Sequence, residues 1–351
     1  MKKKELYGMD LNQIQDILSP YPSYRAKQLY EFMYHRRGVP VGDFSQCSVF
    51  PISLRNELAC NYFLSSLHLE NVLTASDGSK KFSFLLHDKT FIESVALFDK
   101  QKRVTACVSS QVGCKMGCAF CQTARLGFTR NLSAGEILEQ ISIIEAQVGL
   151  IDNIVFMGMG EPLDNFKQVS KALSILIDPM GFNFGQRRIT VSTSGIIEGI
   201  EHLANLKTQI RLAVSLNSAL QEKRISIMPI GKNNTLKKLH RALKAYQLST
   251  NNRRITLEYV CLDNFNLFKE DSEAIIQFCD GLNVLINLIP FNPSNELSFQ
   301  RPKDKTILNF AHTLTERGLR VTIRNSKGQE VLGACGQLAA LHVKQLSGEQ
   351  Q

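Results

Sequence analysis

Strand-like and helix-like patterns alternate along the chain from about residue 104 onward. Short apolar, β-branched runs are typical of buried strands, and apolar residues at three- and four-residue spacing between them are typical of amphipathic helices. The strand-like runs are 104–108, 154–157, 189–192, 210–215, 255–260, 284–289 and 321–324. Repeated strand–helix units form a parallel sheet whose functional groups lie at the carboxyl ends of the strands. About six units are too few for a closed eight-stranded barrel, so we predict an α/β fold with an open, partial (β/α)6 barrel.

The residues before this region predict a helical segment followed by a β extension. Residues 1 to about 65 contain helix signals, including a capping-box pattern made by Asp10 and Gln13. From residue 80 the pattern changes to β, with runs at 82–86 and 91–98. We therefore predict a helical accessory domain with its linker over 1–80, an α/β domain with an N-terminal β extension over 81–345, and a C-terminal tail over 346–351.

The charge balance indicates a polyanionic partner. The chain has 41 Lys and Arg against 32 Asp and Glu, a formal net charge of +9, and basic residues neutralise phosphates with release of counterions. Many basic proteins bind no nucleic acid, so the charge alone leaves the question open. The second predicted helix has a basic face with aromatic neighbours, which suits RNA contact, although a solvated charged face is the alternative. Its members are Arg25, Lys27, Arg36 and Arg37, beside Tyr24 and Tyr34.

Composition also bears on the compartment. With 44% hydrophobic and 21% charged residues, the chain is expected to bury a substantial core rather than remain disordered. No apolar run reaches the roughly 20 residues that span a bilayer. The Lys-rich start lacks the apolar segment of a secretory signal. We therefore predict a cytoplasmic protein without membrane association.

The chain has nine cysteines, and an odd number in a protein of this size is a poor disulfide framework. Metal binding or catalysis is the better interpretation. Four cysteines are scattered and are expected to be small buried apolar side chains. They are Cys47, Cys60, Cys261 and Cys279.

Cys114, Cys118 and Cys121 form a C-x3-C-x2-C motif between a predicted strand and a predicted helix. Three thiolates at this spacing can ligate three irons of a four-iron, four-sulfur cluster and leave the fourth iron open. That iron can chelate the amino and carboxylate groups of S-adenosylmethionine (SAM), and an electron from the cluster then yields a 5′-deoxyadenosyl radical. Structural zinc is the alternative, but zinc sites use paired ligands that total four, and no second pair follows here.

C-x3-C-x-F-C is the motif of the radical SAM superfamily, and the neighbouring segments resemble one family within it. This is the RlmN family, the dual-specificity rRNA and tRNA adenine-C2 methyltransferases. The matching segments are 107–114 (CVSSQVGC), 127–132 (GFTRNL), 157–162 (MGMGEP), 188–195 (RITVSTSG), 289–293 (IPFNP) and 334–338 (ACGQL). They run in order from about residue 90 to 340. The N-terminal helical segment resembles the family's accessory RNA-contacting domain.

The resemblance implies a set of SAM contacts. Read alone, the glycines of 158–161 allow close backbone approach and the carboxylate of Glu161 could bind the SAM ammonium, but a tight strand-to-helix turn explains the pattern equally well. The family often has His where this chain has Asn217, an amide that still forms hydrogen bonds. The implied SAM contacts are Gly160, Glu161, Ser192, Ser215, Leu216, Asn217 and Asn292.

Three further residues have catalytic roles by the same resemblance. Cys335, in a loop of small residues, is either a buried thiol or a thiol that moves and reacts. The resemblance makes Cys335 the methyl-carrying cysteine, Cys107 the thiol that resolves the covalent adduct, and Glu93 the base. Carbon 2 of adenine is no nucleophile, whereas a thiolate accepts a methyl group by displacement. The S-methyl group then loses a hydrogen atom to the radical, its methylene radical adds to the ring, and release leaves a disulfide. Two SAM molecules are used.

Two other functions remain open from the sequence. One is methylation at carbon 8, as in the related antibiotic-resistance methyltransferases, which share the cluster and both cysteines. The other is a non-enzymatic iron–sulfur RNA-binding protein or redox sensor, which would not need Cys107, Cys335 or the SAM-contact segments. The expected partners are rRNA, probable tRNA and an electron donor such as flavodoxin. We expect a monomer.

Overall fold

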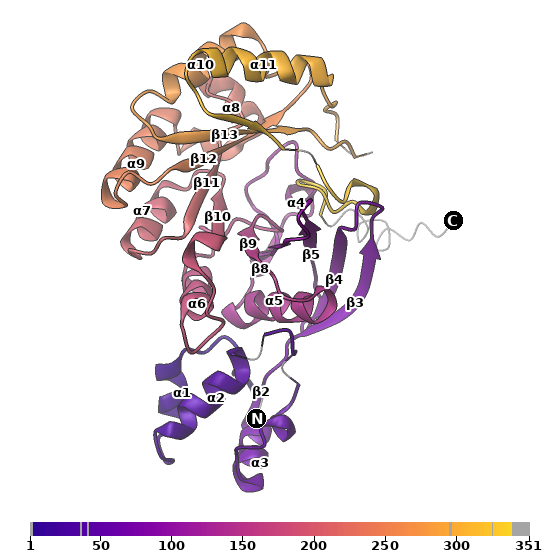
Figure 1. The fold of residues 1–351 in the computed structure, drawn as a ribbon, viewed down its shortest axis with the longest axis vertical. Coiled ribbons are helices and arrows are strands. Elements are labelled where there is room, and N and C mark those ends of the chain that lie inside the picture. Colours follow the sequence, from indigo (N-terminus) through magenta and orange to yellow (C-terminus); the bar gives the residue numbers. More distant parts are fainter. Residues whose placement is uncertain (1–2, 36, 41, 295–296, 325, 339–351) are drawn as a thin grey trace.

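A ten-stranded mixed sheet forms the centre of the protein, in the order β14-β13-β12-β11-β10-β9-β6-β5-β4-β3 (Figure 1). The computed structural model describes residues 3–35, 37–40, 42–294, 297–324 and 326–338. The tail that we predicted over 346–351 therefore lies outside the described residues. The strands of the sheet are β3 (Leu67–Thr74), β4 (Lys80–Leu86), β5 (Phe91–Phe98), β6 (Val104–Cys107), β9 (Asn153–Phe156), β10 (Ile189–Thr193), β11 (Arg211–Ser215), β12 (Ile255–Cys261), β13 (Val284–Pro290) and β14 (Val321–Ile323).

Strands β6 and β9 to β14 are parallel, and β3 to β6 are joined in antiparallel fashion. The edge strands β3 and β14 do not pair with each other, so the sheet is open. Six strand–helix units lead from β6 to β14, which confirms the predicted partial barrel. The helices of this part are α4 (Gln122–Arg125), α5 (Ala134–Val148), α6 (Phe166–Ile177), α7 (Ile197–Asn205), α8 (Gln221–Ile227), α9 (Leu236–Ser249), α10 (Lys269–Phe278) and α11 (Asp304–Glu316).

Short elements fill the connections. Strands β7 (Gln111–Gly113) and β8 (Phe128–Asn131) form a separate antiparallel pair that frames the cysteine motif. The 3₁₀ turns are η1 (Phe44–Gln46), η2 (Gln186–Arg188), η3 (Pro229–Lys232) and η4 (Gln329–Val331). No helix within the described part of the chain is both long and apolar enough to cross a membrane.

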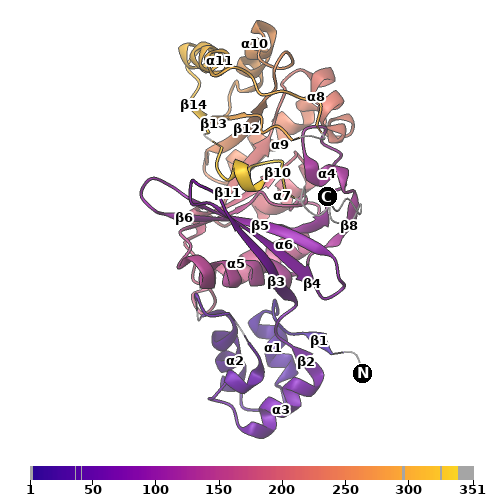
Figure 2. The ribbon, with the colours of Figure 1, turned by 90° about the vertical axis from the view of Figure 1, so that its right-hand side faces the viewer.

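The N-terminal segment is helical, as predicted, with α1 (Leu11–Ile17), α2 (Tyr24–Tyr34) and α3 (Ile52–Asn61). It lies beside α5 and α6, and its short strand β1 (Lys4–Glu5) pairs with β2 (Tyr62–Phe63) (Figure 2). The capping box at the start of α1 is confirmed, because the Asp10 carboxylate accepts a 2.9 Å hydrogen bond from the Gln13 amide. The Tyr30 hydroxyl donates to Asp178 over 2.8 Å and ties α2 to the residue after α6.

The basic face that we predicted on α2 is only partly on the surface. Tyr24 is 51% exposed, but Tyr34 is buried and accepts a hydrogen bond from the Gly8 amide. Arg37 forms an ion pair with the buried Glu145 of α5 and stacks on Phe184. Arg36 lies outside the described residues. Tyr34 therefore ties α2 to the residues before α1, and Arg37, which follows α2, links the helical segment to α5.

Two secondary predictions were incomplete. Strand β3 lies in the segment that we assigned to the linker of the helical domain, yet it pairs with β4. A register shift between Leu69 and Asn71 interrupts its alternation, which hid the strand from a pattern search. The predicted domain boundary at residue 80 stays a prediction. Cys60 is exposed on the solvent side of α3, so its assignment to the core was wrong, whereas Cys47, Cys261 and Cys279 are buried as predicted.

Candidate active site

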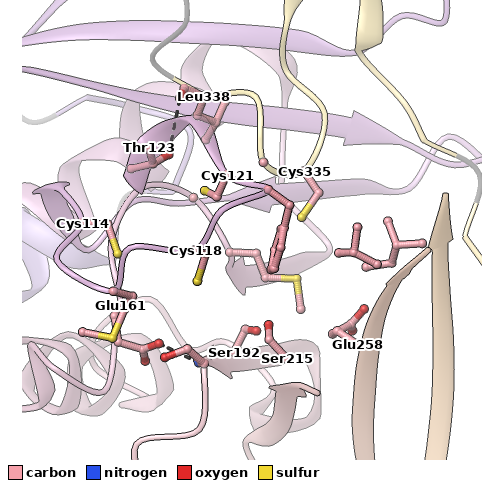
Figure 3. Close-up of a pocket in the computed structure, with 18 of the residues that line it drawn as sticks. Cys114, Cys118, Cys121, Thr123, Glu161, Ser192, Ser215, Glu258, Cys335 and Leu338 are labelled. Carbon is pink, nitrogen blue, oxygen red and sulfur yellow. Dashed lines mark hydrogen bonds between the residues drawn. The ribbon is translucent and has the colours of Figure 1, made fainter. Parts of the chain in front are cut away.

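A cavity opens at the carboxyl ends of the parallel strands. Its walls are the cysteine motif, the ends of β9 to β14 and the C-terminal loop (Figure 3). This is the edge at which parallel α/β sheets place their functional groups. The predicted site residues that line it are Cys114, Cys118, Cys121, Gly160, Glu161, Ser192, Ser215, Asn292 and Cys335.

The β7–β8 pair holds the first cysteine in place. The Cys114 amide donates a 2.7 Å hydrogen bond to the carbonyl oxygen of Gly127. Gly113, just before it, has φ +73, and a Cβ atom there would lie 1.9 Å from the same oxygen. Only glycine fits this crossing of two backbones. At the far end of the motif, Cys121 immediately precedes α4 and its amide bonds the Cys118 carbonyl oxygen.

The three thiols of the motif lie on one wall of the cavity, beside Met116 and Phe120 (Figure 3). Burial raises the pKa of Cys114 to about 12 and that of Cys118 well above the usual value, and charge repulsion among the thiolates adds to both shifts. Among the described residues, no three Cys, His, Asp or Glu side chains converge as they would around a single ion. Three spaced thiolates fit an iron–sulfur cluster.

Glu161 faces this wall from the loop that follows β9. Its carboxylate is 3% exposed and accepts hydrogen bonds from the backbone amides of Ser194 (2.7 Å) and Leu163 (3.1 Å), which fix its orientation. Desolvation by burial raises its pKa, and these hydrogen bonds oppose the rise. Gly160 has φ +99, and a Cβ there would lie 2.5 Å from the Gln111 side chain. The loop thus offers a fixed carboxylate that would suit a ligand ammonium.

The strand ends differ in what they present to the cavity. Ser192 and Ser215 lie side by side on its floor (Figure 3). Leu216 and Asn217, which the resemblance placed with them, are buried and are not among the lining residues. The Asn217 side chain accepts a 2.8 Å hydrogen bond from the Val260 amide and donates to Met228. These two residues hold the end of β11 against β12 in this structure, so their role as SAM contacts stays a prediction.

Cys335 lies where this cavity meets a second one. Its loop is held by hydrogen bonds from the Asn292 side chain to the Cys335 carbonyl oxygen (3.2 Å) and from the Gln122 amide to the Gly336 carbonyl oxygen (2.8 Å). Cys107, at the end of β6, lines the second cavity only. The structure therefore brings together two cysteines that are 228 residues apart in sequence, as the prediction requires.

Cys335 is exposed, whereas Cys107 is half-buried. Desolvation by the surrounding protein raises the pKa of both thiols, and the positive charge of Arg324 opposes both shifts. None of the cysteines among the described residues forms a disulfide.

Glu93, the predicted base, lies fully buried in β5 and lines neither cavity. Its carboxylate forms an ion pair with Lys81 of β4, with 3.1 Å between Nζ and Oε1. Val95, two residues along the same strand, is in register with Cys107. Because paired residues and residues two apart share a face of a sheet, Glu93 and Cys107 lie on the same side.

Sequence reasoning missed three charged residues around the site. Glu258 lines the first cavity from β12 and accepts a 2.7 Å hydrogen bond from Asn287. Arg324 follows β14 and lines both cavities. Lys81 is the buried partner of Glu93. For all three, the sequence feature that could have revealed them was a charged residue within or next to an apolar strand-like run.

One segment of the chain matches a known family model. Residues 108–279 match the Radical SAM superfamily. A dual-specificity RNA methyltransferase RlmN from Campylobacter hominis is 38% identical over 359 residues, covering 97% of this chain and 98% of the relative. The chain belongs to the RlmN family.

Other relatives of this RlmN-family protein agree. A probable dual-specificity RNA methyltransferase RlmN from Treponema denticola is 41% identical over 338 residues, covering 96% of each chain. The crystal structure of a radical SAM methyltransferase from Sphaerobacter thermophilus superimposes with a TM-score of 0.90 at 37% identity, covering 96% of this chain and 99% of that one. The chain is thus a radical SAM enzyme, and its family implies a four-iron, four-sulfur cluster and SAM.

Proposed function

We propose that this RlmN-family enzyme methylates carbon 2 of an adenine in 23S rRNA, and of an adenine in tRNA, through an S-methylcysteine intermediate. The observation that carries the proposal is the position of Cys335 at the junction of two cavities. One cavity contains the three cluster cysteines and Glu161, and the other contains Cys107. A single thiol therefore faces both the radical source and the resolving thiol.

Cys114, Cys118 and Cys121 would hold the cluster, and Glu161 would bind the ammonium of SAM with Gly160, Ser192, Ser215 and Asn292 around it. Bound together, the cluster and SAM supply the 5′-deoxyadenosyl radical that removes a hydrogen atom. The fixed carboxylate of Glu161 favours a cationic amine over a neutral group. Because Glu161 is held by backbone amides, it needs no rearrangement to bind its ligand.

Cys335 first accepts a methyl group from one SAM, because its thiolate displaces S-adenosylhomocysteine. Its S-methyl group then loses a hydrogen atom to the radical that derives from a second SAM. The resulting methylene radical adds to carbon 2 of adenine and forms a carbon–carbon bond. Arg324 favours the Cys335 thiolate, since its positive charge opposes the rise in the pKa of that thiol caused by desolvation.

Glu93 and Cys107 complete the reaction in this proposal. Glu93 takes the proton from carbon 2, and the Cys107 thiolate attacks the sulfur of Cys335 to form a disulfide. The carbon–sulfur bond breaks with its electron pair on the methylene carbon, which takes up a proton and becomes the methyl group. The ring releases one electron as it regains aromaticity. This electron balances the one that was used to generate the radical. An external donor, such as flavodoxin, then supplies two electrons to reduce the disulfide.

The cellular setting belongs to the same proposal. The net charge of +9 suits an RNA substrate, and the exposed part of the helical segment offers Tyr24 and Lys27 for contact with it. We propose that the protein acts as a monomer in the cytoplasm.

Product analysis tests the proposal. The holoenzyme, reconstituted anaerobically, is incubated with SAM, a reductant and protein-free 23S rRNA or tRNA from a strain that lacks the modification. Digested nucleosides are compared by mass spectrometry with 2-methyladenosine and 8-methyladenosine. We expect 2-methyladenosine with the native enzyme and none with Cys335→Ala. A main product of 8-methyladenosine, or no methylated adenosine despite SAM cleavage, would overturn the assignment.

A further inference from the structure

A buried ion pair lies in the antiparallel extension of the sheet. The side chains of Lys81 in β4 and Glu93 in β5 are both 0% exposed, and Nζ and Oε1 are 3.1 Å apart. The two residues are diagonal neighbours, because Lys81 is in register with Val95 and Glu93 with Ser83. Among the ion pairs of the described residues, Lys81 takes part in this one alone.

The pair is on the side of the sheet that faces the reactive thiols. Lys81, Val95 and Cys107 are in register across three strands, and residues in register share a face. Leu97 and Cys107 line the second cavity, so this is the cavity side. The opposite face lies against α5, where Ser94 donates a 2.6 Å hydrogen bond to Gln140.

Stability does not account for a pair of this kind. Removing two charges from water costs several kcal/mol per ion, and apolar residues of similar volume are often at least as stable. The same strand has Phe82 and Phe84 fully buried on its other face, so apolar packing is available to this segment. When a charged pair is buried away from water on the same face of a sheet as reactive groups, a functional role is the better explanation for its presence.

We propose that Lys81 is a positioning residue for Glu93. Its ammonium holds the carboxylate on the thiol side of β5 and supplies the counter-charge that an anionic base requires where water is excluded. This inference rests on the proposed function, in which Glu93 takes the proton from carbon 2 of the RNA adduct. In that step the carbon–hydrogen bond breaks, the proton moves to a carboxylate oxygen of Glu93, and the electron pair stays in the ring.

The proposal separates early from late steps of the cycle. Methyl transfer to Cys335 and formation of the carbon–carbon bond need neither Lys81 nor Glu93. Release of the methylated adenine needs both. Loss of Lys81 should therefore leave RNA covalently attached to the protein, rather than prevent attachment.

The test compares Lys81→Met with Lys81→Arg and Glu93→Gln in the reconstituted enzyme with 23S rRNA. Mass spectrometry measures methylation of Cys335, denaturing gels measure the protein–RNA adduct, and nucleoside analysis measures 2-methyladenosine. We expect Lys81→Met to retain Cys335 methylation, accumulate the adduct and form product roughly 10- to 100-fold more slowly, at the lower end of what proton transfer contributes. Lys81→Arg should recover part of the rate. The matched control is Lys80→Met, the adjacent lysine, which should match the native enzyme.

A double variant keeps the test informative if Lys81→Met fails to fold. Lys81→Met combined with Glu93→Gln leaves no unpaired buried charge, and it should behave like Glu93→Gln alone because the two residues act as one unit. A double variant that is slower than Glu93→Gln by a further factor of ten would overturn the proposal. The proposal would also be overturned if Lys81→Met forms product at the native rate while Glu93→Gln does not. In that case Glu93 would remain the proposed base, but it would not need Lys81. A native rate in Glu93→Gln removes the base assignment and the role of Lys81 with it.

Discussion

The glycine crossing beneath the cysteine motif allows a sharp test of how the backbone holds the cluster site. Gly113 and Gly127 have nearly the same backbone conformation, with φ of +73 and +71. A Cβ on Gly113 would lie 1.9 Å from the Gly127 carbonyl oxygen, whereas a Cβ on Gly127 would meet no atom within 4 Å. Gly113→Ala must therefore separate the two backbones by more than about 1 Å, since a Cβ essentially never approaches an oxygen within about 3 Å.

The expected energies differ in a defined way. Both alanines incur about 1–2 kcal/mol for a left-handed backbone. Gly113→Ala also loses the 2.7 Å hydrogen bond from the Cys114 amide to Gly127, a contribution of about 1 kcal/mol, and adds the steric conflict. We expect the free energy of unfolding of Gly113→Ala to be lower than that of Gly127→Ala by at least about 1 kcal/mol. The additional destabilisation should be local to the segment that positions Cys114.

Iron and sulfide content per chain after anaerobic reconstitution is the assay, with urea unfolding in parallel. Gly113→Ala should bind clearly less cluster than the native chain, and Gly127→Ala should bind nearly the native amount. Equal cluster content and equal stability in the two variants would refute the argument, because it would mean that the close contact with Gly127 imposes no constraint.

Three further predictions follow from the same structure. Glu161→Gln should weaken SAM binding to the reconstituted enzyme roughly 10- to 150-fold in equilibrium dialysis, because a charged hydrogen bond contributes about 1.5–3 kcal/mol; unchanged affinity would contradict its role. Desolvation raises the pKa of Cys335 above that of a free thiol, so its alkylation by iodoacetamide should rise about 100-fold from pH 7 to pH 9, as only the thiolate reacts; a rate independent of pH would show that the thiol is already ionised. Arg37→Met leaves Glu145 buried without its partner and, because Arg37 is 25% exposed, should lower the free energy of unfolding by about 2 kcal/mol in urea titration, somewhat below the 3–5 kcal/mol of fully buried pairs; a loss below about 0.5 kcal/mol would contradict this reading.

Local chemistry made much of this protein predictable. The spacing of Cys114, Cys118 and Cys121 is a property of one short loop, and the alternation of strands and helices follows from hydrophobic periodicity within each segment. The capping box of Asp10 and Gln13 is likewise complete within four residues. The open partial barrel and the family could therefore be predicted before the structure.

Contacts between distant segments set the limit of prediction. Strand β3 is defined by its pairing with β4, since its own alternation is interrupted. The side chain of Asn217 bonds Val260 and Met228, so its motif position alone did not reveal where it points. Tyr34 bonds the Gly8 amide, 26 residues earlier, and Arg37 pairs with Glu145 of α5, 108 residues further along the chain.

The kind of chemistry could be predicted from the order of residues, because thiol spacing and glycine positions are local requirements of a cluster loop. Which charges and thiols share an environment depends on the packed fold. Lys81 and Glu93 are unremarkable polar residues in two strand patterns until the register of β4 and β5 buries them together. Cys107 and Cys335 meet because the C-terminal loop returns to the end of β6. Register and chain return depend on the free energy of the whole packed sheet, which no single segment specifies.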